Sequence, residues 1–112
     1  MNFDELPEFQ KEFKRLGNRY KSMSDDLQVF CNVGSVIPRG NSKHFIIITQ
    51  TEVVCMVKAR FFCRYLKGSS LRIVYAYFEQ LRKIEFIELY HKGDKESEDR
   101  DRIKEYLKSQ EA

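Results

Sequence analysis

The segment Val53–Phe62, with the sequence VVCMVKARFF, gives the main evidence for the fold. Its β-branched and apolar residues favour a strand. Successive side chains of a strand point to opposite faces of the sheet, so Lys58 and Arg60 share one face. Val57 and Ala59 point to the other face. A strand with one apolar and one partly cationic face indicates a sheet that packs on a core mainly on one side.

Apolar, β-branched runs on either side predict further strands at residues 45–49, 71–78 and 83–90. Glycine and serine in the segment 67–70 indicate a loop, and residues 80–83 indicate a turn. If the strand 71–78 pairs with Val53–Phe62, Arg72 joins Lys58 and Arg60 around one patch. The strands therefore predict a small, mostly antiparallel twisted sheet of three to four strands.

Helical periodicity flanks these strands on both sides. Leu6-Pro7-Glu8 opens a helix that ends near Tyr20, because proline and an acid suit a first turn. A second helix begins at Ser22 or Ser24, with an apolar face that includes Val33, and stops at Pro38. A charged helix over 97–109 has a narrow apolar stripe made by Ile103, Tyr106 and Leu107.

The order of elements predicts an α+β fold. Two N-terminal helices pack on one face of the sheet, a C-terminal helix follows, and the other sheet face stays partly open. The length of 112 residues suits a single domain over residues 1–112. No apolar run approaches the length of a membrane helix, and the N-terminus does not resemble a signal peptide. We therefore expect no membrane partner.

The three cysteines form no C-x-x-C pair. An odd count without metal-ligand spacing favours free thiols in a reducing compartment, and so predicts a cytoplasmic protein. The positive charge is concentrated in the middle of the chain, where residues 38–75 hold seven Lys and Arg but one acid, Glu52. Such concentration suggests an anionic partner, nucleic acid first, although a solvated sheet face would look the same.

Signatures of phosphate-loop, serine-hydrolase, zinc-protease and EF-hand chemistry are absent, and two histidines cannot make a multi-histidine metal site. We expect neither a metal nor another cofactor. Cations that converge as Lys58, Arg60 and Arg72 would do are suited to a phosphodiester and to its charge during transfer. The predicted catalytic residues are Lys58, Arg60, Arg72, Tyr90, His91 and Lys92, and the further phosphate-binding residues are Lys43, Arg64 and Lys67.

These residues resemble toxins of the RelE/ParE superfamily from bacterial type II toxin–antitoxin systems, and most of all their RelE/HigB-like branch. The resemblance lies in the order of the elements and in five short motifs. They are LPEF at 6–9, VKAR at 57–60, KG at 67–68, LRIVY at 71–75 and IELYHK at 87–92.

The resemblance implies an mRNA endoribonuclease that works on the ribosome without metal and inhibits translation. In this family the ribose 2′-hydroxyl attacks the adjacent phosphate. Lys58 and Arg60 match the basic pair on the strand, and Arg72 matches the arginine of the following strand. Tyr90 or His91 would stack on a base or move a proton, and the choice of general base stays open between Lys58, His91 and neither.

The resemblance also implies a cognate antitoxin as partner, with the toxin a monomer alone or part of a hetero-oligomer. Two alternatives remain for the function. One is a gyrase inhibitor of the ParE kind, which shares an arginine at the position of Arg72, and the other is a nucleic-acid-binding domain without catalysis. The presence of Lys58 and Arg60 beside Arg72 favours the nuclease.

Overall fold

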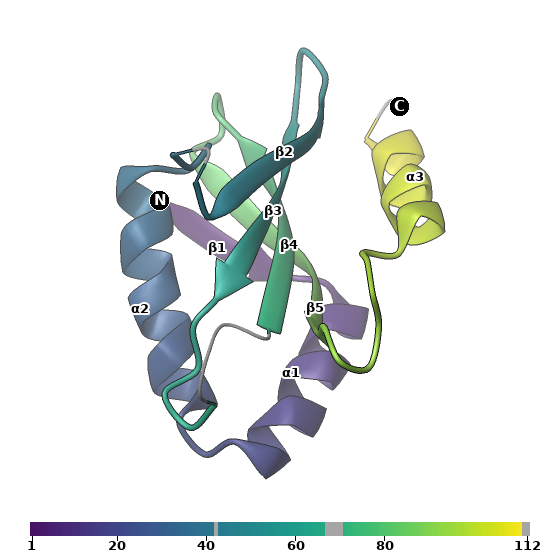
Figure 1. The fold of residues 1–112 in the computed structure, drawn as a ribbon. Coiled ribbons are helices and arrows are strands. Elements are labelled where there is room, and N and C mark those ends of the chain that lie inside the picture. Colours follow the sequence, from purple (N-terminus) through teal and green to yellow (C-terminus); the bar gives the residue numbers. More distant parts are fainter. Residues whose placement is uncertain (42, 67–70, 111–112) are drawn as a thin grey trace.

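The computed structural model describes residues 1–41, 43–66 and 71–110, so the predicted loop 67–70 lies outside the described residues. The helices and strands follow one another in the order predicted, with one strand added at the N-terminus (Figure 1). The elements are β1 (Asn2–Glu5), α1 (Pro7–Arg19), α2 (Met23–Val36), β2 (Phe45–Gln50), β3 (Cys55–Phe61), β4 (Leu71–Phe78), β5 (Lys83–His91) and α3 (Arg100–Ser109). None of the described helices is both long and apolar enough to span a bilayer.

The sheet has five strands in the order β1-β5-β4-β3-β2, which corrects the predicted three to four. Strands β2 to β5 form the expected antiparallel meander, whereas β1 pairs in parallel with β5. The sequence of β1, NFDE, lacks the β-branched residues of a typical strand. Phe3 nevertheless stacks on Phe86 of β5 with ring centroids 5.9 Å apart, and this contact helps to hold the segment in place.

One face of the sheet carries the larger core, under α1 and α2. Phe9 and Leu16 of α1 and Phe30 of α2 are buried there against strand residues such as Ile73 and Tyr75. These strand residues, with Val57 and Ala59, have exposures of 1% or less, as the alternation predicted for the core side. Phe30 packs its ring against Phe45, Phe61, Tyr75 and Phe86 and so joins four strands to one helix.

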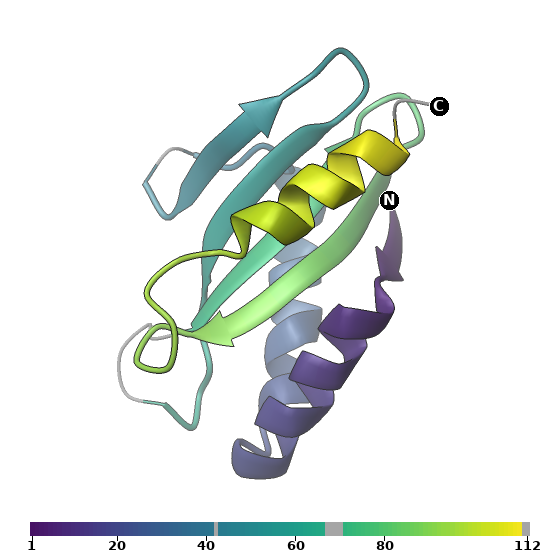
Figure 2. The same cartoon turned by 90° about the vertical axis from the view of Figure 1, so that its right-hand side faces the viewer.

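Helix α3 packs on the opposite face, so the second face is less open than the sequence suggested. Figure 2 shows α3 crossing in front of the sheet while α2 lies behind it. Ile103 and Tyr106 are buried against Met56, Val74 and neighbouring residues of the sheet. The helix begins at Arg100, not at 97, because the Asp99 side chain caps it by accepting a hydrogen bond from the Arg102 amide.

Strand β3 is shorter than the predicted Val53–Phe62. The Thr51 hydroxyl oxygen accepts hydrogen bonds from the amides of Val53 and Val54, at 3.2 and 3.1 Å, and this turn places both residues before the strand. Val33 of α2 also differs from the prediction, since 40% of it is exposed instead of lying in the core. Both differences leave apolar side chains at the surface.

Two glycines give opposite predictions for stability. Gly40 has a φ of +78°, and a Cβ there would lie 2.1 Å from the Cβ of Phe45. Gly40→Ala is therefore expected to destabilise the protein by about 2 kcal/mol, through strain and displacement of the Phe45 ring.

Gly17 lies within α1 with no neighbour inside 4 Å, and Gly17→Ala should stabilise the protein by about 0.5–1 kcal/mol. Urea unfolding measures both, and equal effects would contradict the assigned conformations.

Candidate functional site

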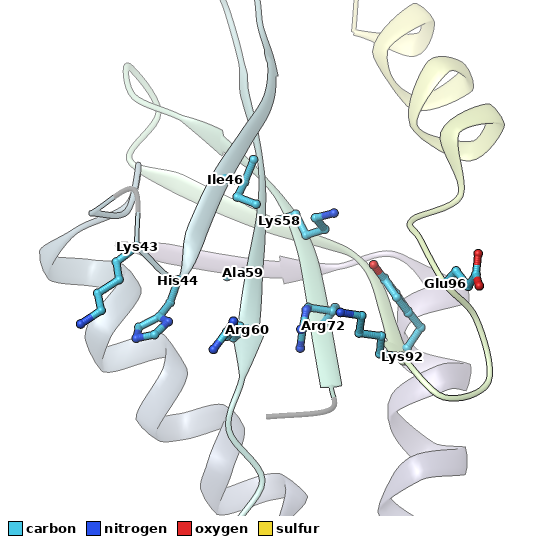
Figure 3. A pocket seen from close by; sticks show the side chains of 10 residues that line it. Lys43, His44, Ile46, Lys58, Ala59, Arg60, Arg72, Lys92 and Glu96 are labelled. Carbon is cyan, nitrogen blue, oxygen red and sulfur yellow. The ribbon is translucent and has the colours of Figure 1, made fainter. Parts of the chain in front are cut away.

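A cavity of about 280 Å³ opens on the second face of the sheet, where β3, β4 and β5 come together beside the segment that leads into β2. Figure 3 shows Arg60 and Arg72 side by side, with His44 beyond one and Lys92 beyond the other. The lining residues of this cationic cavity are Lys43, His44, Ile46, Lys58, Ala59, Arg60, Arg72, Tyr90, Lys92 and Glu96. Five of them are lysine or arginine, so an anion is the ligand that the cavity suits.

Strand register brings three of the predicted residues into one line. Arg60 of β3 pairs with Arg72 of β4, and Arg72 pairs with Tyr90 of β5. Directly opposed side chains on an antiparallel sheet lie about 5 Å apart at Cβ, and like charges there are destabilising. The Arg72 Nη1 donates to the Leu71 carbonyl oxygen at 3.1 Å, which orients its guanidinium. A fold that places two guanidiniums together is well suited to an anion that binds both.

Lys58 has a carboxylate partner inside the protein. Its Nζ donates to Glu98 Oε1 at 2.9 Å, and the Glu98 side chain is 1% exposed. Arg100 contacts the other carboxylate oxygen at 2.9 Å, as a charge contact without hydrogen-bond geometry. Burial alone would raise the pKa of Glu98, yet the hydrogen bond and charge of Lys58 hold this pKa below its ordinary value. Glu98 is therefore a carboxylate at neutral pH.

The segment between β5 and α3 forms one wall of the cavity. It brings Glu96 to the lining and Glu98 to Lys58. Glu88 of β5, which is fully buried, anchors this segment through an ion pair with Lys95 and by accepting a hydrogen bond from the Asp99 amide at 2.9 Å. Sequence reasoning missed these acids. The available signal was Glu88 itself, a carboxylate inside an otherwise apolar strand.

Tyr90 is buried and lines the cavity, with the Lys95 ammonium 5.3 Å from the centroid of its ring. Burial, followed by the negative charges of Glu98 and Glu88, raises the pKa of its phenol to about 12, although Arg72 acts in the other direction. The Tyr90 hydroxyl is therefore protonated at neutral pH. It can donate a proton or a hydrogen bond but cannot serve as a base.

This raised pKa gives a spectroscopic prediction. Tyr90→Phe should remove phenolate absorbance that develops near pH 12, above the ordinary tyrosine value of about 10. Because the folded state holds the proton more tightly, this contribution to stability is present below pH 10 and is lost as the pH rises through 12. Difference titration of the two proteins at 295 nm is the measurement. A lost signal centred near pH 10 would contradict the placement of Tyr90.

Not every predicted site residue lines the cavity. His91 pairs with Leu71, and its Nδ1 accepts a hydrogen bond from the Gly93 amide at 2.9 Å. Arg64 is exposed and lies 3.6 Å from Asp25, also away from the lining. Lys67 lies outside the described residues. His44 and Ile46 do line the cavity but were not predicted, because their position depends on how β2 joins β3.

The arrangement can bind a phosphodiester and stabilise added negative charge on it. Guanidinium groups each offer two parallel N–H donors to phosphate oxygens, and Lys92 adds a point charge. A neutral phenol beside them supplies a proton donor. Phosphoryl transfer needs these functions, since charge increases on the phosphorus oxygens and on the leaving oxygen.

The fold is similar to that of a protein in the crystal structure of an archaeal RelE–RelB complex from Pyrococcus horikoshii. The TM-score is 0.64 at 16% sequence identity, and the match covers 82% of this chain and 94% of that one. No protein-family model matches the chain, and no curated protein matches it significantly. The chain therefore has a RelE-like fold, as its sequence resemblance predicted.

Proposed function

We propose that the chain is a toxin of a type II toxin–antitoxin system, a single domain over 1–112 that cleaves mRNA on the ribosome and so inhibits translation. The observation that carries the proposal is the line of Arg60, Arg72 and Tyr90 across three adjacent strands, inside a cavity with five cationic side chains. The RelE-like fold adds support at the level of architecture.

In the proposed reaction the ribose 2′-oxygen forms a bond to phosphorus, and the bond from phosphorus to the 5′-oxygen breaks. The products are a 2′,3′-cyclic phosphate and a free 5′-hydroxyl. Arg60 and Arg72 would bind the two non-bridging oxygens, on which charge increases in the transition state. The reaction requires no metal, because the nucleophile belongs to the substrate and the protein supplies the positive charge.

Two protons move in this reaction. The phenol of Tyr90, protonated at neutral pH, would donate its proton to the 5′-oxygen that leaves. The proton of the 2′-hydroxyl would pass to Glu96, a carboxylate among the lining residues. Lys58, which is bound to Glu98, would then act through its charge. His91 does not line the cavity, so it takes no part in this scheme.

The proposed partner is a cognate antitoxin, and the proposed location is the cytoplasm, where mRNA and ribosomes are found. The similar structure is a RelE–RelB complex, which supports a protein partner for this chain as well. Under this proposal the toxin is a monomer alone and part of a hetero-oligomer with its antitoxin.

Induction of the chain in a bacterial host, followed by mapping of mRNA 5′ ends, tests the function. The expected result is arrested growth with new 5′ ends that fall in register with codons. Growth arrest with intact transcripts would overturn the nuclease. In that case a supercoiling assay with purified gyrase would decide whether the chain acts as a gyrase inhibitor.

A further inference from the structure

An apolar groove adjoins the cationic cavity at the start of β2. It has a volume of about 190 Å³, and its lining residues are Asp26, Val29, Phe30, Val33, Ile37, Asn41, His44, Phe45, Arg60 and Phe62. His44 and Arg60 line both the groove and the cationic cavity. An occupant of the groove would therefore lie directly beside any anion held by Arg60.

Two large apolar side chains in the walls of the groove are exposed to solvent. Val29 is 61% exposed and Phe62 is 59% exposed, although both lie next to the large core under α2. The Phe62 ring meets the ring of His44 edge to face, with centroids 5.9 Å apart. Exposed aromatic rings next to a guanidinium are the surfaces on which proteins stack unpaired bases of RNA.

The junction between the two cavities also holds a polar atom without a partner. The Nδ1 of His44 is buried and makes no hydrogen bond to any of the described residues. A buried polar atom of this kind is normally satisfied by a protein group, water or a ligand. The edge of a base carries donors and acceptors beside its flat apolar faces, so a base suits a groove lined by apolar side chains together with Asp26, Asn41, His44 and Arg60.

We infer that the groove binds one nucleobase of the RNA whose phosphates occupy the cationic cavity, stacked against Phe62 and bounded by Arg60 and His44. This inference rests on the proposed function and adds a base subsite to it. The small volume suits one ring system better than the face of a partner helix. Because His44 and Arg60 line both the groove and the cationic cavity, the ligand that fits both carries a flat apolar group next to an anion. A nucleotide has this structure.

The test uses short RNA oligonucleotides with 2′-O-methyl ribose at every position, so that they bind but have no free 2′-hydroxyl with which to be cleaved. One oligonucleotide has all of its bases, and each of the others lacks one base in turn. Dissociation constants are measured for the unmodified protein and for Phe62→Ala. Tyr65→Ala is the matched control, because Tyr65 is equally exposed, at 59%, but lies outside both linings.

Phe62→Ala is expected to weaken binding of the complete oligonucleotide about 10-fold, as for loss of one base–aromatic stack. The same substitution should have no effect on the oligonucleotide that lacks the base bound in the groove. Equal weakening for every oligonucleotide, or none for any, would overturn the inference. So would a Phe62→Ala protein that binds RNA normally but is no longer neutralised by an antitoxin encoded beside it.

Arg72→Ala separates failure of this inference from failure of the proposed function. If Arg72→Ala binds all of the oligonucleotides as tightly as the unmodified protein, RNA does not occupy the cationic cavity and the proposed function fails. If Arg72→Ala loses binding while Phe62→Ala does not discriminate between the oligonucleotides, only the base subsite fails. Phe62 is exposed and Arg72 is partly exposed, and thermal unfolding of each variant tests whether it is folded.

Discussion

Arg72→Ala is expected to lower the rate of RNA cleavage by about 100-fold or more, the usual cost of removing one charge-stabilising donor from an active site. Arg72 lies between Arg60 and Tyr90 in the sheet, so its guanidinium is central to the proposed phosphate site. Loss of a like charge opposite Arg60 should leave stability unchanged or slightly raised. Cleavage of a ribosome-bound transcript and the midpoint of thermal unfolding are the two measurements.

Arg64→Ala is the matched control, because it removes the same kind of charge from a residue outside the cavity. It should cleave RNA at nearly the normal rate. Arg72→Lys keeps the charge but loses the paired donors, so its cleavage rate should lie between those of Arg72→Ala and Arg64→Ala. An Arg72→Ala protein that is unfolded, or one that cleaves normally, would contradict the role of Arg72 as a phosphate-binding residue.

Glu12→Ala is expected to destabilise the protein by about 3 kcal/mol, the range for breaking one side of a largely buried ion pair. Glu12 of α1 accepts hydrogen bonds from the Leu89 amide at 3.1 Å and from Arg102 at 2.9 and 3.2 Å. The Arg102 and Glu12 side chains are 18% and 17% exposed. Arg102 also donates to the Ile87 carbonyl oxygen, so one carboxylate couples α1, β5 and α3. Without it, the Leu89 amide loses its acceptor, and the Arg102 guanidinium loses its carboxylate partner but keeps the Ile87 carbonyl oxygen.

Urea unfolding measures this effect, with Lys11→Ala on the exposed side of the same helix as control. Glu12→Gln should recover part of the loss, because its amide oxygen still accepts from the Leu89 amide. When Arg102→Met is already present, Glu12→Ala should lower the free energy of unfolding by less than it does in the unmodified protein, since the two residues act as a pair. A loss below about 1 kcal/mol for Glu12→Ala would mean that the pair is solvated and contributes little.

The spacing of apolar residues along the sequence predicted the strands and helices in which this spacing is regular. The two-residue period of VVCMVKARFF and LRIVYAYF placed Arg60 and Arg72 on one sheet face, and the register confirms that they pair. The helices α1 and α2 were found from their apolar spacing and their first turns. These features depend on neighbours within a few residues, which is the range that a sequence shows directly.

Tertiary contacts explain the features that were missed. Strand β1 has a polar sequence and is held by pairing with β5, whose paired residues lie 81 positions later in the sequence. The position of α3 depends on Arg102, whose partner Glu12 lies 90 positions away in sequence, and on Glu88, which holds the segment before the helix. The pairing of Lys58 with Glu98 joins residues 40 positions apart, so no local pattern could indicate it.

The pairing of β1 with β5 has a consequence for how the protein is made. Asn2 lies opposite Lys83, so β1 leaves the ribosome before its partner β5 and cannot pair until β5 has been made. Contacts between such distant segments are slow to form, because a long loop must close first. Until β5 is made, β1 has no neighbour, and the strand that carries Tyr90 does not yet exist. Each newly made molecule is therefore expected to reach its complete form only after translation of β5 has ended.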